Sequence, residues 1–512
     1  MIISKIKKSD WVVLFFLLLA VVAFRYPSFD LPLDHDSGSV AFLARQLTRG
    51  YILYDTFHPA HHLPGIYYTF ELAFKLFGDN PNSPKVLLIF WELASTWFLY
   101  ILGQLIGGKR LGILGALFFI MASSLGGLSG FTVEMEHFAN LPMIAGVLLT
   151  IVLLQKKSPN WKFLWIGILG AICILYKITF VSSLAVAGVG ILTAAWIERE
   201  QADVWKTVLS RIIWTIIGIV IPLVMVAGYF ASLGLWNRFL LIFAFGFNYF
   251  NDVSIMHLAG LPPPFGFPIV VLTANNFMLL ATGLLGVFFL FYQTFPLNDK
   301  RKLSGFLLAI WLIFTFAQTG LRGGGYNYYV LMTLSPLALT SAFAIFNSYE
   351  KRKLRAPRQF MAVFETAILI ALIAANNIWT NGIFFSHYIP YKMGTISYDE
   401  FLANVDNMGE YNLSNTIVRY IQEHTNSDDF IYLWGEQVQL YYYTDRQPPI
   451  DILWTSYVSA TGPRERIFNP RTKYIAVDDI KLRPQWLLDG LDQNYYLEVV
   501  IEGMEIYRRV KP

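Results

Sequence analysis

Charged residues and cysteine are scarce in this 512-residue sequence. Asp, Glu, Lys and Arg make up 14% of the chain, whereas soluble proteins carry about 25%. The single cysteine, Cys173, stands inside an apolar run, so no internal disulfide framework can form, and we interpret this thiol as a core residue. The net charge of +4 is modest, and no Rossmann-type glycine loop is present. We therefore expect no nucleic-acid partner.

Hydrophobic residues account for 55% of the chain and occur in long runs. Apolar stretches of about 18 residues or more are typical of membrane-spanning helices, and about eleven can be placed. The sequence therefore predicts a polytopic α-helical membrane protein. The first span is expected to be uncleaved, because Phe24-Arg25-Tyr26-Pro27 lacks the small residues of a signal-peptidase site. The expected spans are 11–27, 84–104, 109–126, 138–155, 162–178, 180–197, 209–232, 270–294, 304–320, 326–346 and 361–381.

Lysine and arginine recur in every second loop between these spans. Short basic loops stay on the cytoplasmic side of a membrane. We therefore expect a multi-pass protein of the cell membrane with a cytoplasmic N-terminus and an extracytoplasmic C-terminal region. The basic loops contain Lys109/Arg110, Lys156/Lys157/Lys162, Arg199/Lys206, Lys300/Arg301/Lys302 and Lys351/Arg352/Lys353/Arg355/Arg358.

Three segments on the extracytoplasmic side are too long to be simple connections, namely 28–83, 233–269 and the tail. We expect a transmembrane module over 1–384 and a small extracytoplasmic α/β domain over 385–512. A helix is predicted in the tail at Ser414–His424. Strands are predicted at Phe430–Trp434, Ile450–Trp454, Tyr474–Val477, Tyr495–Ile501 and Met504–Tyr507.

Two carboxylates, Asp34 and Asp36, follow the first span and precede an expected amphipathic helix that runs through Leu47. A carboxylate near the membrane surface can act as a general base on an acceptor hydroxyl. Asp is equally typical of a helix N-cap. The two interpretations are compatible, and both stay open at this point.

Three histidines, His58, His61 and His62, follow in the same segment, before an expected interfacial helix at Ile66–Phe77. Imidazoles and nearby carboxylates can bind a divalent metal, but their spacing matches no strong metal motif, so a metal is not favoured. The alternative is that these histidines bind a phosphate or cap turns. No cofactor is expected.

Further charged residues fall where the spans approach the extracytoplasmic side. Glu134 and Glu136 open the fourth span, Lys177 interrupts an apolar run, and Arg322 precedes the glycines Gly323–Gly325. A charge within a span is costly and often functional, although Lys177 can also extend to the interface and Arg322 can be an ordinary loop charge. Together these residues predict one pocket with acids, bases and phosphate ligands.

These motifs resemble those of the GT-C superfamily, in which membrane glycosyltransferases use polyprenyl-phosphate sugars, in the branch of protein O-mannosyltransferases and aminoarabinose transferases. Asp36-Ser37-Gly38 is similar to the motif of the family's first outer loop. Tyr54-Asp55-Thr56-Phe57 and the stretch from His61 to Tyr68 are similar to its second element. The chain departs from the family at His62-Leu63-Pro64, where the family has Lys-Pro-Pro, which replaces a constant charge by a partly protonated side chain.

The resemblance implies an inverting transfer of a sugar from a polyprenyl-phosphate carrier to an acceptor hydroxyl, with no obligatory metal. The family's catalytic Asp maps onto Asp36, with Asp34 as the second choice. Its other acidic residue maps onto Glu136, or less well onto Glu134. Lys177, Arg322 and His62 are expected to meet the donor phosphate. The substrate pocket is expected to contain Asp55, His58, His61, Glu134 and Tyr328.

Two other classes of function remain. A lipid or glycan transporter would place its polar residues near the bilayer midplane, often in repeated halves, and no repeat is visible. A receptor or scaffold would use the C-terminal domain and would leave the charges of the first loop unexplained. The acceptor is open between a protein hydroxyl, lipid A of lipopolysaccharide, another cell-envelope polymer and a glycolipid.

Overall fold

The computed structural model describes residues 8–156, 158–252, 263–320, 326–350, 356–405, 415–455, 457–458, 464–478 and 483–510. The chain forms two compact units, each built from segments that are distant in sequence. The helical unit comprises Met1–Asp30, Lys85–Tyr229 and Phe250–Ile389, and the mixed unit comprises Leu31–Pro84, Phe230–Tyr249 and Pro390–Pro512.

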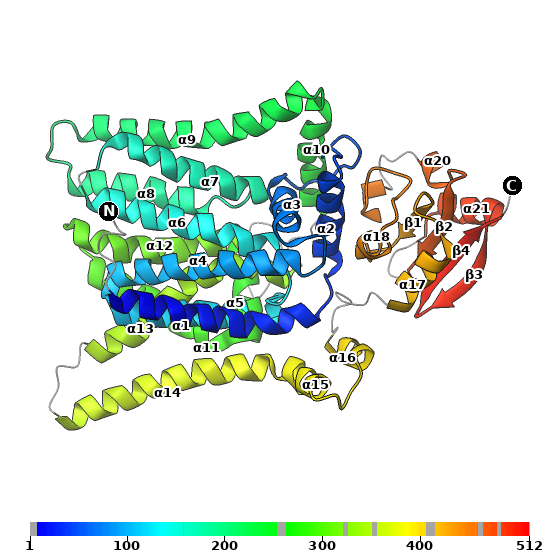
Figure 1. Ribbon diagram of the computed structural model, residues 1–512. Coiled ribbons are helices and arrows are strands. Elements are labelled where there is room, and N and C mark those ends of the chain that lie inside the picture. Colours follow the sequence, from blue (N-terminus) through cyan, green and yellow to red (C-terminus); the bar gives the residue numbers. More distant parts are fainter. Residues whose placement is uncertain are drawn as a thin grey trace. The chain divides into compact units, whose positions relative to one another are not determined.

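Apolar helices make up the helical unit, as expected of chains that must satisfy their backbone hydrogen bonds within lipid. A helix overlaps every span predicted from the sequence. Within this unit, α9 and α14 lie at opposite margins (Figure 1). The helices are α1 (Lys8–Arg25), α4 (Ser83–Gly107), α5 (Lys109–Ser123), α6 (Met135–Gln155), α7 (Leu164–Tyr176), α8 (Ser182–Ile197), α9 (Val204–Ser232), α11 (Pro263–Thr294), α12 (Leu303–Gly320), α13 (Leu334–Glu350), α14 (Ala356–Thr380) and α15 (Gly382–Lys392).

The length of these helices supports a multi-pass membrane protein. Seven described helices are long and apolar enough to cross a bilayer, and the bent pair α14–α15 raises this number to as many as eight. Helices α7 and α8 are apolar but shorter, and the 13 residues of α7 extend only about 20 Å. The hydrocarbon core of a bilayer is about 30 Å thick. The polytopic helical fold is therefore confirmed, while the count of about eleven spans stays a prediction.

The mixed unit combines helices from the first long loop with the C-terminal sheet. Helix α3 (Gly65–Phe77) corresponds to the helix predicted at Ile66–Phe77, and α2 (His35–Thr48) corresponds to the helix predicted before it. The other helices are α10 (Trp236–Asp252), α16 (Tyr398–Val405), α17 (Asn415–His424), α18 (Gln439–Thr444), α20 (Arg464–Ile467) and α21 (Gln485–Asn494). The strands are β1 (Phe430–Trp434), β2 (Thr472–Val477), β3 (Tyr495–Ile501) and β4 (Met504–Arg509).

The four strands form one mixed sheet in the order β1-β2-β4-β3. Strands β1 and β2 are parallel, while β4 pairs antiparallel with both β2 and β3. Glu502 and Gly503 connect β3 to β4 with φ of 50° and 85°, because a tight two-residue hairpin requires positive φ at both positions. The predicted α/β character of the tail is confirmed.

The strand predicted at Ile450–Trp454 is wrong. This segment is irregular, although Ile450 and Ile452 are buried in the core beside the sheet. Gln447 forms an isolated bridge to β1, and Pro448-Pro449 then removes two consecutive N–H donors. The apolar residues that suggest a strand here are buried without forming a strand.

Candidate functional site

Glu136 and Lys177 form a buried ion pair in the helical unit. Glu136 lies in the first turn of α6 and is fully buried, and Lys177 is the C-cap of α7 and is 8% exposed. Nζ of Lys177 donates to Oε1 of Glu136 at 2.7 Å. Two buried charges of opposite sign must be paired closely to offset their lost hydration. The structure thus brings together two residues that the sequence singles out separately.

Tyrosine rings contact the ammonium of this pair. Nζ of Lys177 lies 3.8 Å from the ring centroid of Tyr329 and 5.9 Å from that of Tyr328, both in the short helix η6 (Asn327–Thr333). A cation over an aromatic face is stabilised by the ring quadrupole. Among the described residues, none hydrogen-bonds to Oε2 of Glu136. In the part of the chain described, the pair therefore combines a held cation with a carboxylate that accepts a hydrogen bond at one of its two oxygens.

Asp34 and Asp36 have different roles at the start of α2. Asp34 is the N-cap, 3% exposed, and its Oδ1 accepts the N–H of Ser37 at 3.1 Å. Asp36 lies in the first helical turn with a quarter of its side chain exposed, and its Oδ1 lies 3.6 Å from Nε2 of His35. Asp34 thus uses an oxygen for capping, whereas the carboxylate of Asp36 lies beside His35.

His58 is held by backbone groups of the mixed unit. Its imidazole is 2% exposed, and its Nε2 lies 2.8 Å from the carbonyl oxygen of Arg238. Its backbone N–H donates to the carbonyl of Asp451 at 2.8 Å. Burial lowers the pKa of His58 below its ordinary value. These contacts describe a neutral histidine that ties the first loop to two other segments of its unit.

His61 and His62 lie beside aromatic residues of the C-terminal segment. Their rings are 4.3 Å apart. Nδ1 of His61 is 2.6 Å from the hydroxyl of Tyr457, and the ring of Trp454 meets His62 edge-on at 5.7 Å. All four side chains are partly exposed. The structure thus places two predicted site residues in a polar and aromatic cluster that the sequence did not predict.

Tyr67 adds a buried phenol to this cluster. Its hydroxyl is 3.1 Å from Nδ1 of His62. Burial raises the pKa of the Tyr67 phenol well above its ordinary value, and the charges of Tyr54 and Asp36 add to the rise. The phenol therefore stays protonated and can donate a hydrogen bond.

The predicted site residues are thus divided between the two units. Glu134 is the buried N-cap residue of α6, and Asp55 is exposed in a turn. Arg322 lies outside the described residues. The helical unit contains Glu134, Glu136, Lys177 and Tyr328, and the mixed unit contains Asp34, Asp36, Asp55, His58, His61 and His62. No group of three or more His, Cys, Asp or Glu in the described part of the chain has the arrangement of a metal site.

A second buried charge cluster escaped the sequence prediction. Arg25, at the end of α1, forms a two-nitrogen ion pair with the carboxylate of Glu92. The same guanidinium also contacts the carbonyls of Gly130 and Ser123 and Nδ1 of His137. Arg25 and Glu92 are 2% and 4% exposed. The sequence did contain a signal for this pair. Glu92 is a lone acid inside one predicted span and Arg25 stands near the end of another, and charges in spans need partners.

The fold is similar to that of two solved proteins, ArnT and AglB. The chain matches ArnT from Cupriavidus metallidurans bound to undecaprenyl phosphate with a TM-score of 0.60 and 13% identity, over 98% of this chain and 99% of that one. It matches the oligosaccharyltransferase AglB from Archaeoglobus fulgidus, in complex with an inhibitory peptide and a dolichol-phosphate, with a TM-score of 0.53 and 13% identity, over 98% and 74%. No protein-family model and no curated protein sequence matches the chain.

Proposed function

We propose that this protein is an integral membrane glycosyltransferase that moves a sugar from a polyprenyl-phosphate carrier to an acceptor hydroxyl. The observation that carries the proposal is the buried ammonium of Lys177, which is held at 2.7 Å by Glu136 and faces the ring of Tyr329. It occurs on a fold whose solved examples include proteins bound to undecaprenyl phosphate and dolichol-phosphate. A fixed cation in a region of low dielectric suits the departure of a phosphate.

The proposed reaction is a single displacement. Asp36 accepts the proton of the acceptor hydroxyl, and the oxygen forms a bond to the anomeric carbon of the sugar. The bond between this carbon and the carrier phosphate breaks with its electron pair on the phosphate oxygen, so the configuration inverts. Lys177 meets the charge of the departing phosphate, and Arg322 and His62 are proposed to assist it. Glu136 holds the ammonium of Lys177 in place.

The same proposal gives the protein a direction in the membrane. The basic residues of alternate loops support a cytoplasmic N-terminus. The domain of residues 385–512 and the loop of residues 28–83 are then extracytoplasmic. The acceptor is a lipid, glycan or protein of the cell envelope, and the sugar is a hexose or a pentose.

A deletion strain tests the reaction in the cell. Loss of the gene should remove one sugar from one envelope glycan, lipid or protein, and mass spectrometry of extracts identifies it. The wild-type gene should restore the sugar, and Asp36→Asn should not. Asp203→Asn is the matched control, because this carboxylate is 74% exposed at the start of α9 and pairs only with Lys206 in the structure described. Full restoration by Asp36→Asn would refute the assignment of the base.

An assay in detergent separates transfer from transport, since micelles have no two sides. Purified protein is mixed with the lipid-linked sugars extracted from the deletion strain and with envelope acceptor from the same strain. The transferase releases free polyprenyl phosphate, which mass spectrometry detects. A transporter leaves the carrier-linked sugar intact, and that result would reject the proposed function.

A further inference from the structure

Helix α2, which carries Asp34 and Asp36, packs closely against α18 of the C-terminal segment within the mixed unit. A Cβ atom at Gly38 would lie 2.2 Å from Cβ and 2.8 Å from Cα of Gln439. No side chain fits at such distances, so only glycine allows the two helices to approach. Gly38 stands two residues after Asp36. The last residue of the Asp-Ser-Gly motif is thus explained by a contact with α18.

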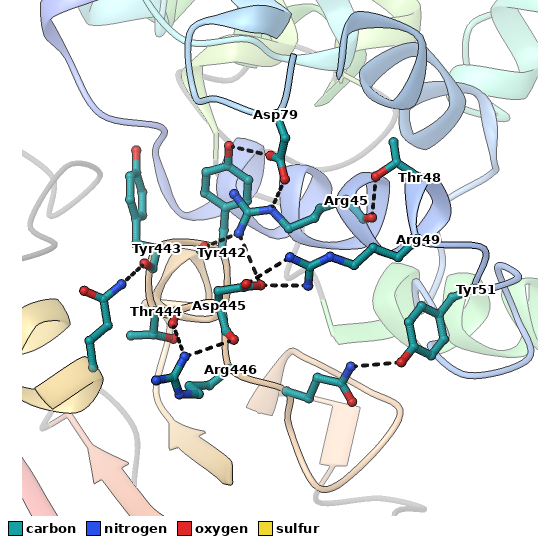
Figure 2. A network of polar contacts seen from close by, with 12 residues as sticks. Arg45, Thr48, Arg49, Tyr51, Asp79, Tyr442, Tyr443, Thr444, Asp445 and Arg446 are labelled. Atoms are coloured by element: carbon teal, nitrogen blue, oxygen red, sulfur yellow. Dashed lines mark hydrogen bonds and ion pairs between the residues drawn. The ribbon is translucent and has the colours of Figure 1, made fainter. Parts of the chain in front are cut away.

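Polar contacts also join α2 and α18 near the C-terminal end of α2 (Figure 2). Both terminal nitrogens of Arg49 bind the carboxylate of Asp445, at 2.8 and 2.9 Å. Arg45 donates to the carbonyl of Tyr442 at 2.6 Å, and its guanidinium lies 3.8 Å from the centre of that ring. Nε of Arg45 also donates to Asp79 at 2.7 Å. A planar guanidinium with several partners holds one orientation, which a lysine would not do.

The N-terminal end of α2 is held as well. The backbone N–H of Leu33, directly before Asp34, donates to the hydroxyl of Tyr443 at 2.8 Å. The rings of Phe42 and Tyr441 are 5.7 Å apart in the middle of the helix. Helix α18 therefore contacts α2 or its flanks at both ends and in the centre.

We propose that α18 is a positioning element for the catalytic base: by holding α2 through Gly38, Arg49 and Leu33, it fixes the direction in which Asp36 presents its carboxylate. The C-terminal segment then contributes to turnover without touching the substrate. This inference rests on the proposed function, because it takes Asp36 as the base. A displacement of about 1 Å in a catalytic group can lower a rate on the order of a hundredfold.

Asp445→Asn and Tyr443→Phe are the first test, in purified full-length protein. The Arg49–Asp445 pair is 41% and 45% exposed, so its loss should change the thermal midpoint little. Asn also tolerates the left-handed backbone of residue 445, where φ is 52°. Each variant should lower kcat by about tenfold, with KM for the extracted carrier-linked sugar within about twofold of wild type. Unchanged kcat in both variants would overturn the proposal.

Asp429→Asn and Tyr507→Phe are the matched controls within the same segment. Asp429 pairs with Lys473 at 3.2 Å, and the hydroxyl of Tyr507 donates to Glu505 at 2.7 Å. Neither pair includes a residue of α2, so kcat should stay at the wild-type value. A fall in kcat equal to that of Asp445→Asn would indicate a general effect on folding and would reject positioning through α18.

The pair Gly38→Ala and Gln439→Gly tests the helix contact itself. Gly38→Ala should abolish measurable turnover or folding. The double variant removes the 2.2 Å contact but keeps Cα of residue 439 at 2.8 Å, so it should regain only part of the thermal midpoint and of the kcat. A Gly38→Ala variant with the thermal midpoint and the kcat of wild type would contradict the close helix contact and the proposal. Asp36→Asn is assayed in parallel. Full activity of Asp36→Asn removes the proposed base, whereas an inactive Asp36→Asn beside an active Asp445→Asn and Tyr443→Phe removes only the role of α18.

Discussion

Nζ of Lys177 donates to Oε1 of Glu136 at 2.7 Å, although the two residues are 41 positions apart. Neither side chain is more than 8% exposed. Such a pair stabilises a protein less than its distance suggests, because both groups lose their hydration. In the proposed function, the pair instead supplies a fixed charge for the phosphate of the carrier.

Single replacements at this pair should destabilise the protein. Lys177→Met leaves a buried carboxylate without its cation, and Glu136→Gln leaves the ammonium without its anion. Each should lower the free energy of unfolding by about 3–5 kcal/mol. The double variant Glu136→Gln/Lys177→Met should recover much of this loss but no transferase activity, since the phosphate of the carrier still lacks its cation.

Thermal unfolding in detergent and release of polyprenyl phosphate measure the two effects separately. Lys206→Met is the matched control, because the Lys206–Asp203 pair is 87% and 74% exposed and should be worth almost nothing. Normal turnover in the double variant would show that Lys177 serves the fold alone.

Asp34 and Asp36 should respond differently to the same substitution. Asn caps a helix about as well as Asp, so Asp34→Asn should keep stability and most activity, while Asp34→Ala should cost about 1 kcal/mol. Asp36→Asn should keep stability and abolish transfer, because an amide does not accept the proton. Thermal midpoints and kcat of the three proteins check this. An inactive Asp34→Asn beside an active Asp36→Asn would exchange the two assignments.

Arg25 should be irreplaceable by lysine. Its guanidinium reaches both oxygens of Glu92 and two carbonyls at once, and a lysine presents a single nitrogen. We expect both Arg25→Lys and Arg25→Met to lower the free energy of unfolding, Arg25→Met by about 3–5 kcal/mol because it leaves Glu92 buried and unpaired. Glu92→Gln/Arg25→Met should be more stable than Arg25→Met. A wild-type thermal midpoint for Arg25→Lys would refute this geometry.

Much of the fold follows from periodicity and apolar length alone. The strands at Phe430–Trp434 and Tyr495–Ile501 match their predicted bounds, because each is rich in apolar and aromatic residues, with Glu498 as the one charge among them. Helix α18 was missed since its Tyr441-Tyr442-Tyr443 run has no helical period. In the structure this helix packs against α2.

Sequence reasoning located single charges of the candidate site better than their partners. Lys177 and Glu136 stand out because a charge in an apolar run is expensive. The pairing of Arg25 with Glu92 joins residues 67 positions apart, and only the packing of helices creates it. Gly38 is similar: its motif predicts its importance, whereas the contact with Gln439 gives the physical reason.

His58 should make the protein sensitive to mild acid. Its pKa is lowered by burial in the folded chain, whereas a histidine in an unfolded chain has a pKa of about 6.5. Between the lowered pKa and this value the unfolded chain binds more protons, so stability rises with pH. The contribution is complete above about pH 6.5 and is lost as the pH falls through 6.5 toward the folded pKa.

The change in thermal midpoint between pH 7.5 and 5.5 measures this effect. The free energy of unfolding should fall by on the order of 1 kcal/mol for each unit by which the pKa of His58 is lowered. His58→Gln should be less stable than wild type at pH 7.5 but should lose less on acidification, since its amide donates to the carbonyl of Arg238 without taking up a proton. His424→Gln, on an exposed position of α17, should keep the wild-type slope. An identical slope in His58→Gln and wild type would exclude His58 as the source, and would direct the search to other buried groups that gain protons on unfolding.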